Sequence, residues 1–119
     1  AEDNEINQEI AVRILEALGL TVTVVSDGKA CVDRVTAEPD TYQLIFMDIQ
    51  IPVMDGYEAA AAIRSSSIPT VQAIPIVAMT ADVFSAAYDR CMAVGMNDMV
   101  TKPIDPAALR AVIKKYLNC

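Results

Sequence analysis

Residues 44–56, LIFMDIQIPVMDG, join a short apolar run to a carboxylate and a tight loop. The apolar residues before Asp48 predict a buried strand, because a strand inside a parallel sheet is covered on both faces. Asp48 stands where this strand ends. A carboxylate in such a place is costly unless a cation or hydrogen-bond donors pair with it. We therefore expect partners for Asp48 elsewhere in the chain.

The residues after Asp48 favour a loop and then a helix. Pro52 stiffens the loop, and Gly56 permits a turn that a residue with a Cβ atom would resist. From Gly56 the sequence GYEAAAAIRSS is rich in alanine and predicts a helix. Strand, loop and helix thus follow one another within about 25 residues, as in a strand–helix unit of a parallel sheet.

The rest of the chain continues this alternation. Apolar residues at helical spacing predict a helix over 4–18, and LTVTVV at 20–25 alternates like a strand. The remaining predicted elements are a short helix within 26–40, strands at 43–48, 74–80 and 98–103, and helices at 83–94 and 106–117, with a loop around 65–69. A helix followed by four strand–helix units predicts an α/β fold, with a parallel sheet between two helical layers.

Size and composition predict one domain, residues 1–119, with an aliphatic core. A hydrophobic content of 54% excludes a disordered chain, and the net charge of −7 opposes binding to nucleic acid or to an anionic membrane. The apolar runs are far shorter than the ~20 residues that span a bilayer. We expect a cytoplasmic domain that contacts neither nucleic acid nor membrane.

The cysteines and the absence of histidine limit the chemistry. Cys31, Cys91 and Cys119 are widely spaced and form no CxxC pair, which argues against both a disulfide framework and a zinc site. No histidine is present, which excludes Ser-His-Asp catalysis and a phosphohistidine on this chain. A reducing, cytoplasmic setting fits this pattern.

Three predicted strands end on Asp48, Thr80 and Lys102, and the acidic pair Glu2 and Asp3 precedes the first helix. The carboxyl ends of parallel strands meet at one edge of the sheet, where α/β proteins place their sites. Clustered carboxylates repel unless one is protonated or a hard cation binds, and Mg²⁺ is the natural candidate. Such a site suits phosphoryl transfer to Asp48, with Thr80 donating a hydrogen bond and Lys102 offsetting negative charge.

Four motifs resemble those of response regulator receiver domains in two-component signalling. They are EDN at 2–4, MDIQIPVMDG at 47–56, MTA at 79–81 and TKP at 101–103. The longer stretches EDNEINQEIA and GMNDMVTKPID are most similar to receivers of hybrid histidine kinases. The resemblance implies a flavodoxin-like, doubly wound parallel sheet with strand order 2-1-3-4-5.

The resemblance also implies a function. Asp48 would accept a phosphoryl group from a phosphohistidine on a histidine kinase or a histidine phosphotransfer protein, and the change would switch partner interactions. Mg²⁺ would be held by Asp3, Asp48, the backbone carbonyl of Gln50 and, through water, Glu2, while Thr80 and Lys102 bind the phosphoryl group. The domain would catalyse its own phosphorylation without being a free-standing enzyme. The parent protein would be a histidine kinase, for which a membrane anchor is compatible.

Two positions depart from the family pattern. An apolar strand normally precedes the acidic pair and lies between the strands at 20–25 and 43–48, but here only Ala1 precedes Glu2. We expect unpaired backbone groups and an open apolar face there, in a fragment of a longer protein or in a dimer that exchanges a strand. Met99 stands where the family has an inward-turning aromatic residue, so signal output through that residue is in question.

Two other functions are alternatives to a phosphoacceptor. One is a pseudo-receiver, an interaction module whose partner binding ignores phosphate and Mg²⁺. The other is a phosphatase with an aspartyl nucleophile, which would need a second acid two residues after Asp48. Gln50 stands at that position, which disfavours the phosphatase.

Overall fold

The computed structural model describes residues 5–38, 41–49, 54–80, 85–101 and 106–117. Its helices are α1 (Glu5–Ala17), α2 (Gly28–Ala37), α3 (Gly56–Arg64), α4 (Pro69–Gln72), α5 (Ser85–Ala93) and α6 (Pro106–Leu117). Its strands are β1 (Ile45–Asp48), β2 (Ile76–Thr80) and β3 (Asp98–Thr101). All but one of the predicted elements are present, with shifts of a few residues at their ends.

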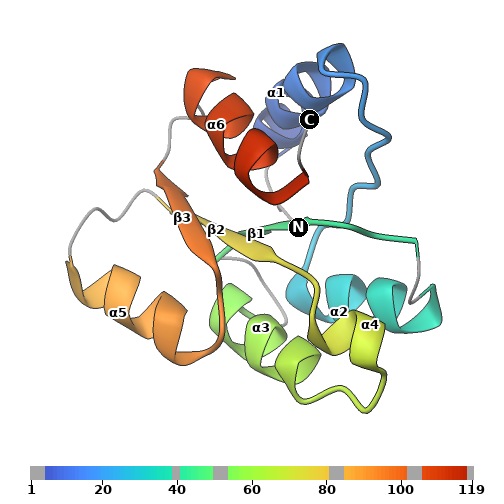
Figure 1. The fold of residues 1–119 in the computed structure, drawn as a ribbon, viewed down its shortest axis with the longest axis vertical. Helices are drawn as coiled ribbons and strands as arrows, with labels where there is room; N and C mark the ends of the chain where they lie inside the picture. Colours follow the sequence, from blue (N-terminus) through green and yellow to red (C-terminus); the bar gives the residue numbers. More distant parts are fainter. Residues whose placement is uncertain (1–4, 39–40, 50–53, 81–84, 102–105, 118–119) are drawn as a thin grey trace.

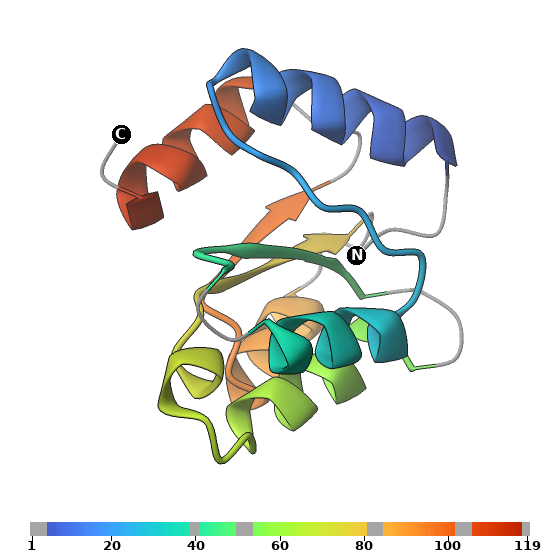
Figure 2. The same ribbon diagram turned by 90° about the vertical axis from the view of Figure 1, so that its right-hand side faces the viewer.

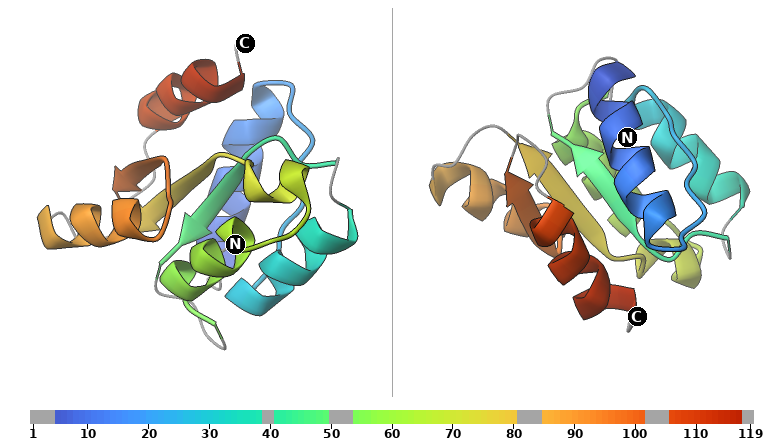
Figure 3. Two further views of the ribbon diagram at one scale, coloured as in Figure 1. Left: turned by 60° about the horizontal axis from the view of Figure 1, so that its bottom comes forward. Right: turned by 90° about the horizontal axis from the view of Figure 1, so that it is seen from above.

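The three strands form a parallel sheet in the order β1-β2-β3 (Figure 1). Helices α1 and α6 cover one face, and α2, α3 and α5 cover the other (Figure 2). Seen from the first face, α1 lies in front of β1 while α6 lies in front of β3 (Figure 3, right). These three layers confirm the predicted α/β fold. No helix in the described ranges is long and apolar enough to cross a membrane.

Local sequence signals fix the helix ends. Asp27 begins α2, because its Oδ1 accepts a hydrogen bond from the backbone N–H of Ala30 at 2.7 Å. Asp55 caps α3 in the same way, accepting from the N–H of Glu58 at 2.9 Å. Gly19, with φ +85°, ends α1 in a conformation that favours glycine.

Strand β2 lies at the centre of the core, and all five of its residues are buried. Methionine contributes to this core at Met47 and Met96, where its flexible side chain can fill gaps between aliphatic side chains. The cluster between the sheet and the α2–α3–α5 layer contains Cys31, Val35, Ile45, Met47, Ile49, Ala59, Ala60, Ile63, Val71, Ile74, Ile76, Ala78, Cys91 and Met96.

The predicted strand at residues 20–25 is wrong, since these residues form neither helix nor strand. A strand needs a hydrogen-bonded neighbour. A cavity of about 420 Å³ lies beside this segment, lined by 20–25, by residues of α1 and α2, and by Leu44, Ile45 and Phe46 of the β1 region. A second difference is α4, a single helical turn that Pro69 opens in the predicted loop.

The cavity leads to a prediction about stability. This pocket is partly open to solvent, and apolar residues such as Val22, Val24 and Leu44 line it. We expect an added strand of five apolar residues, fused ahead of Ala1, to fill the cavity. Burial of five such side chains contributes about 10 kcal/mol, and ordering them costs roughly 8 kcal/mol. A gain of about 2 kcal/mol should therefore appear in urea unfolding, with slower amide exchange at 20–25. An equal gain from a Gly/Ser extension would contradict it.

Candidate functional site

Asp48 is the last residue of β1, and the residue is only 3% exposed. The next residue, Ile49, is also hydrogen-bonded to β2, because its N–H donates to the carbonyl of Met79 at 3.2 Å. The carboxylate is therefore carried by a backbone fixed to the central strand. No buried side-chain nitrogen or oxygen in the described part of the chain lacks a hydrogen-bond partner.

Thr80 ends the neighbouring strand β2 and is 1% exposed. In the strand register Asp48 pairs with Met79, so Thr80 lies one residue further along the adjacent strand. Thr80 in turn pairs with Thr101, the last residue of β3. The structure thus brings Asp48 and Thr80 to adjoining ends at one edge of the sheet.

The other predicted site residues, Glu2, Asp3, Gln50 and Lys102, lie outside the described residues. Within the described ranges no group of three or more His, Cys, Asp or Glu side chains could hold a metal ion. The donor chemistry at Asp48 fits a hard cation, because Mg²⁺ prefers carboxylate oxygens. Burial strengthens that attraction, since charges interact more strongly away from bulk water.

Gly56 closes the loop that follows Asp48. Its N–H donates to the carbonyl of Ile49 at 3.3 Å, so this hydrogen bond joins the residues on either side of the loop. A Cβ atom on Gly56 would lie 2.7 Å from the Asp48 carbonyl oxygen and 2.5 Å from the Ile49 Cα. Glycine is thus needed for the close approach of α3 to the backbone that carries Asp48.

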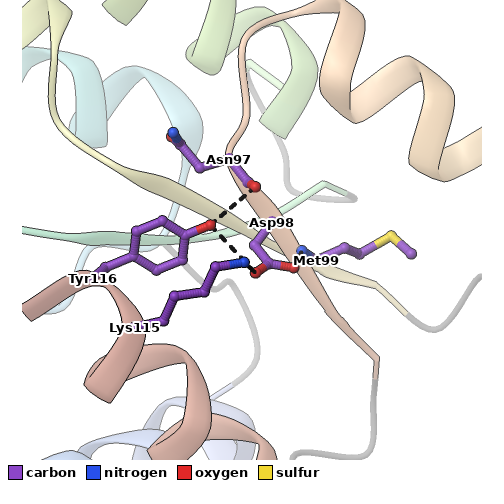
Figure 4. Close-up of polar contacts among 5 residues, drawn as sticks. All are labelled: Asn97, Asp98, Met99, Lys115 and Tyr116. Carbon is purple, nitrogen blue, oxygen red and sulfur yellow. Dashed lines mark hydrogen bonds and ion pairs between the residues drawn. The ribbon is translucent and has the colours of Figure 1, made fainter.

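The end of β3 opposite the site is tied to α6 by polar contacts (Figure 4). Lys115 Nζ lies 3.3 Å from Asp98 Oδ2, and this hydrogen bond raises the pKa of Lys115. The Tyr116 hydroxyl donates to the Asn97 carbonyl at 3.1 Å. The Met99 side chain points away from Tyr116, and it packs against the core. Met99 is therefore a half-buried residue that packs against the core.

Residues 1–114 match the family described as the response regulator receiver domain. This chain belongs to that family. It is 37% identical to "Hybrid signal transduction histidine kinase L" of Dictyostelium discoideum, over 97% of the chain and 7% of the relative. The first curated relatives are far longer than this domain, which spans 7 to 11% of their length. The predicted similarity to receivers of hybrid kinases is confirmed.

Solved structures support the same assignment. The receiver domain of the Pseudomonas aeruginosa sensor kinase PA1611, crystallised with magnesium in its active site cleft, is 35% identical with a TM-score of 0.86, covering 100% of this chain and 94% of that one. The Saccharomyces cerevisiae complex of Ypd1, a histidine phosphotransfer protein, with the Ssk1 receiver domain matches at 30% identity and a TM-score of 0.83, over 97% of this chain and 83% of that one. These likenesses confirm the flavodoxin-like receiver fold.

Sequence reasoning missed two residues that the structure shows to be important, Gly28 and Arg64. The dipeptide Asp27–Gly28 signals a turn before a helix, but nothing local shows what Gly28 contacts. Arg64 reads as an ordinary basic residue in the last turn of a helix. Both act through contacts with residues distant in the sequence.

Proposed function

We propose that this domain accepts a phosphoryl group on Asp48 from a phosphohistidine of a partner histidine kinase or phosphotransfer protein. The observation that carries the proposal is the buried carboxylate of Asp48 at a strand end, beside Thr80, in a chain of the receiver family. A buried carboxylate held by fixed backbone is pre-positioned to act as a nucleophile.

In the proposed step an Asp48 carboxylate oxygen attacks the phosphorus atom. A P–O bond forms, the P–N bond to the partner's imidazole breaks, and its electron pair returns to the imidazole nitrogen. Thr80 donates a hydrogen bond to a phosphoryl oxygen, and the ammonium of Lys102 offsets charge there. When bound, Mg²⁺ would neutralise the phosphoryl oxygens. Asp3, Asp48, the carbonyl of Gln50 and, through water, Glu2 would hold it.

Two comparisons support the cofactor and the partner. The Pseudomonas receiver was crystallised with magnesium, and the yeast receiver with a histidine phosphotransfer protein. We therefore propose Mg²⁺ as the cofactor here and a phosphohistidine protein as the donor. We also propose a reducing, cytoplasmic setting. Two described cysteines, Cys31 and Cys91, are free and buried, and burial raises the pKa of both thiols, which keeps them neutral.

The proposal is tested by exposing the chain to acetyl phosphate with Mg²⁺ or with EDTA, followed by intact-mass measurement. We expect one phosphoryl group per chain with Mg²⁺ and none with EDTA, because the metal is needed to offset charge on the transferred group. The adduct should be lost on treatment with hydroxylamine, which cleaves acyl phosphates. No uptake, together with partner binding that ignores phosphate and Mg²⁺, would favour the pseudo-receiver instead.

A further inference from the structure

Gly28, the first residue of α2, lies against the loop that follows Asp48. A Cβ atom on Gly28 would be 2.0 Å from the Met54 carbonyl oxygen and 2.9 Å from its carbonyl carbon. These are backbone atoms, which cannot rotate away as the end of a flexible side chain would. The start of α2 therefore touches the loop with no room for even a methyl group.

The residues after Met54 connect this contact to β1, the strand that carries Asp48. Met54 is followed by Asp55, which caps α3, and by Gly56, whose N–H donates to the Ile49 carbonyl. Gly56 is itself packed on the backbone of Asp48. Two close approaches thus hold the exit of the loop between the start of α2 and the end of β1.

The start of α2 is firm enough to act as such a support. The capping hydrogen bond from the Ala30 N–H to Asp27 Oδ1 fixes the first turn of the helix. Cys31 and Val35 on the same helix are buried in the core. If a side chain at position 28 forces a shift, we therefore expect the loop to move and α2 to stay in place.

We infer that Gly28 is a positioning residue for the acceptor carboxylate: its missing Cβ sets the place of the Met54 carbonyl, and through Gly56 the place of Asp48. This inference rests on the proposed phosphoacceptor function. A methyl group at Gly28 requires a shift on the order of 1 Å, and misplacement of that size lowers rates by up to about 100-fold.

The test compares Gly28→Ala with Gly19→Ala and with the unchanged chain. Gly19 is a matched control, because its φ of +85° makes alanine strained while nothing lies within 4 Å of the added Cβ. Both variants lose stability, but only Gly28→Ala touches the loop. At a temperature where all three are folded, we expect phosphoryl uptake from acetyl phosphate to slow roughly 10- to 100-fold in Gly28→Ala and less than about 2-fold in Gly19→Ala.

Backbone NMR distinguishes a local displacement from a loss of stability, because a loss of stability alone would not change the amide chemical shifts of the folded state. The amide signals of Asp48, Ile49 and Gly56 should shift in Gly28→Ala and stay in place in Gly19→Ala. If Gly28→Ala does not fold, Asp27→Ala is used instead; it removes the cap on the Ala30 N–H, which loosens the first turn of α2, and should slow phosphoryl uptake more than Gly19→Ala does. Equal uptake rates and unshifted amides in the variant and the control would overturn the inference. A lack of uptake by the unchanged chain would instead refute the proposed function.

Discussion

Asp48→Asn is expected to abolish phosphoryl uptake, with a loss of at least about 100-fold in rate. The amide has no anionic oxygen to attack phosphorus and cannot form the acyl phosphate. The fold should persist, because the amide has nearly the same volume as the carboxyl group and is easier to bury than a charge. The measurement is intact mass after incubation with acetyl phosphate and Mg²⁺, together with the midpoint of urea unfolding.

Asp55→Asn provides the matched control. Asp55 lies seven residues further along and caps α3 through its side-chain oxygen. Asparagine caps helices as well as aspartate does, so folding should be unchanged. We expect full phosphoryl uptake by this variant. Uptake by Asp48→Asn at the rate of the unchanged chain would show that the acceptor is another residue.

Sequence patterns predicted three strands of the sheet and the location of Asp48 and Thr80 at strand ends, because those features are local. A continuous apolar run that stops at Asp48 and another that stops at Thr80 each mark a strand end, and parallel strands bring such ends together. The strand predicted at 20–25 failed for a nonlocal reason. Its alternating pattern is real, but the pattern does not show whether a neighbour is present to pair with it.

The roles of Gly28 and Arg64 could not be predicted either, because they depend on contacts with residues far away in the sequence. Gly28 is needed because the carbonyl of Met54, 26 positions later, lies against it. Arg64 bonds to residues from 72 to 97. Such contacts depend on the packing of whole elements, which residue spacing along one helix does not reveal.

Arg64, near the end of α3, holds together the edge of the sheet opposite Asp48. Its Nε donates to the Gly95 carbonyl, and its Nη1 donates to the carbonyls of Gln72 and Ile74, each at 2.7 Å. Its Nη2 donates to Asn97 Oδ1, which also accepts from the N–H of Ile76. Burial lowers the pKa of Arg64. The four hydrogen bonds connect α3 with the turns before β2 and β3.

The backbone conformation of Gly95 and its contact with Arg64 both favour glycine. Its φ of +93° favours glycine, and a Cβ atom there would lie 2.7 Å from Arg64 Cγ. The guanidinium stem therefore packs directly on the turn whose carbonyl it binds. The planar fork of arginine suits several acceptors at once, which lysine could not replace.

Arg64→Met is expected to lower the free energy of unfolding by about 3 kcal/mol. Hydrogen bonds to a charged group contribute roughly 1.5–3 kcal/mol each, less when half-exposed, and the part-buried carbonyls of Gly95 and Ile74 would lose this donor. Urea unfolding measures the loss. Arg13→Met is the control, because Arg13 is 77% exposed and forms a surface ion pair with Glu9 one helical turn earlier; it should cost less than about 0.5 kcal/mol. Equal effects of the two variants would mean that the Arg64 hydrogen bonds merely replace bonds to water.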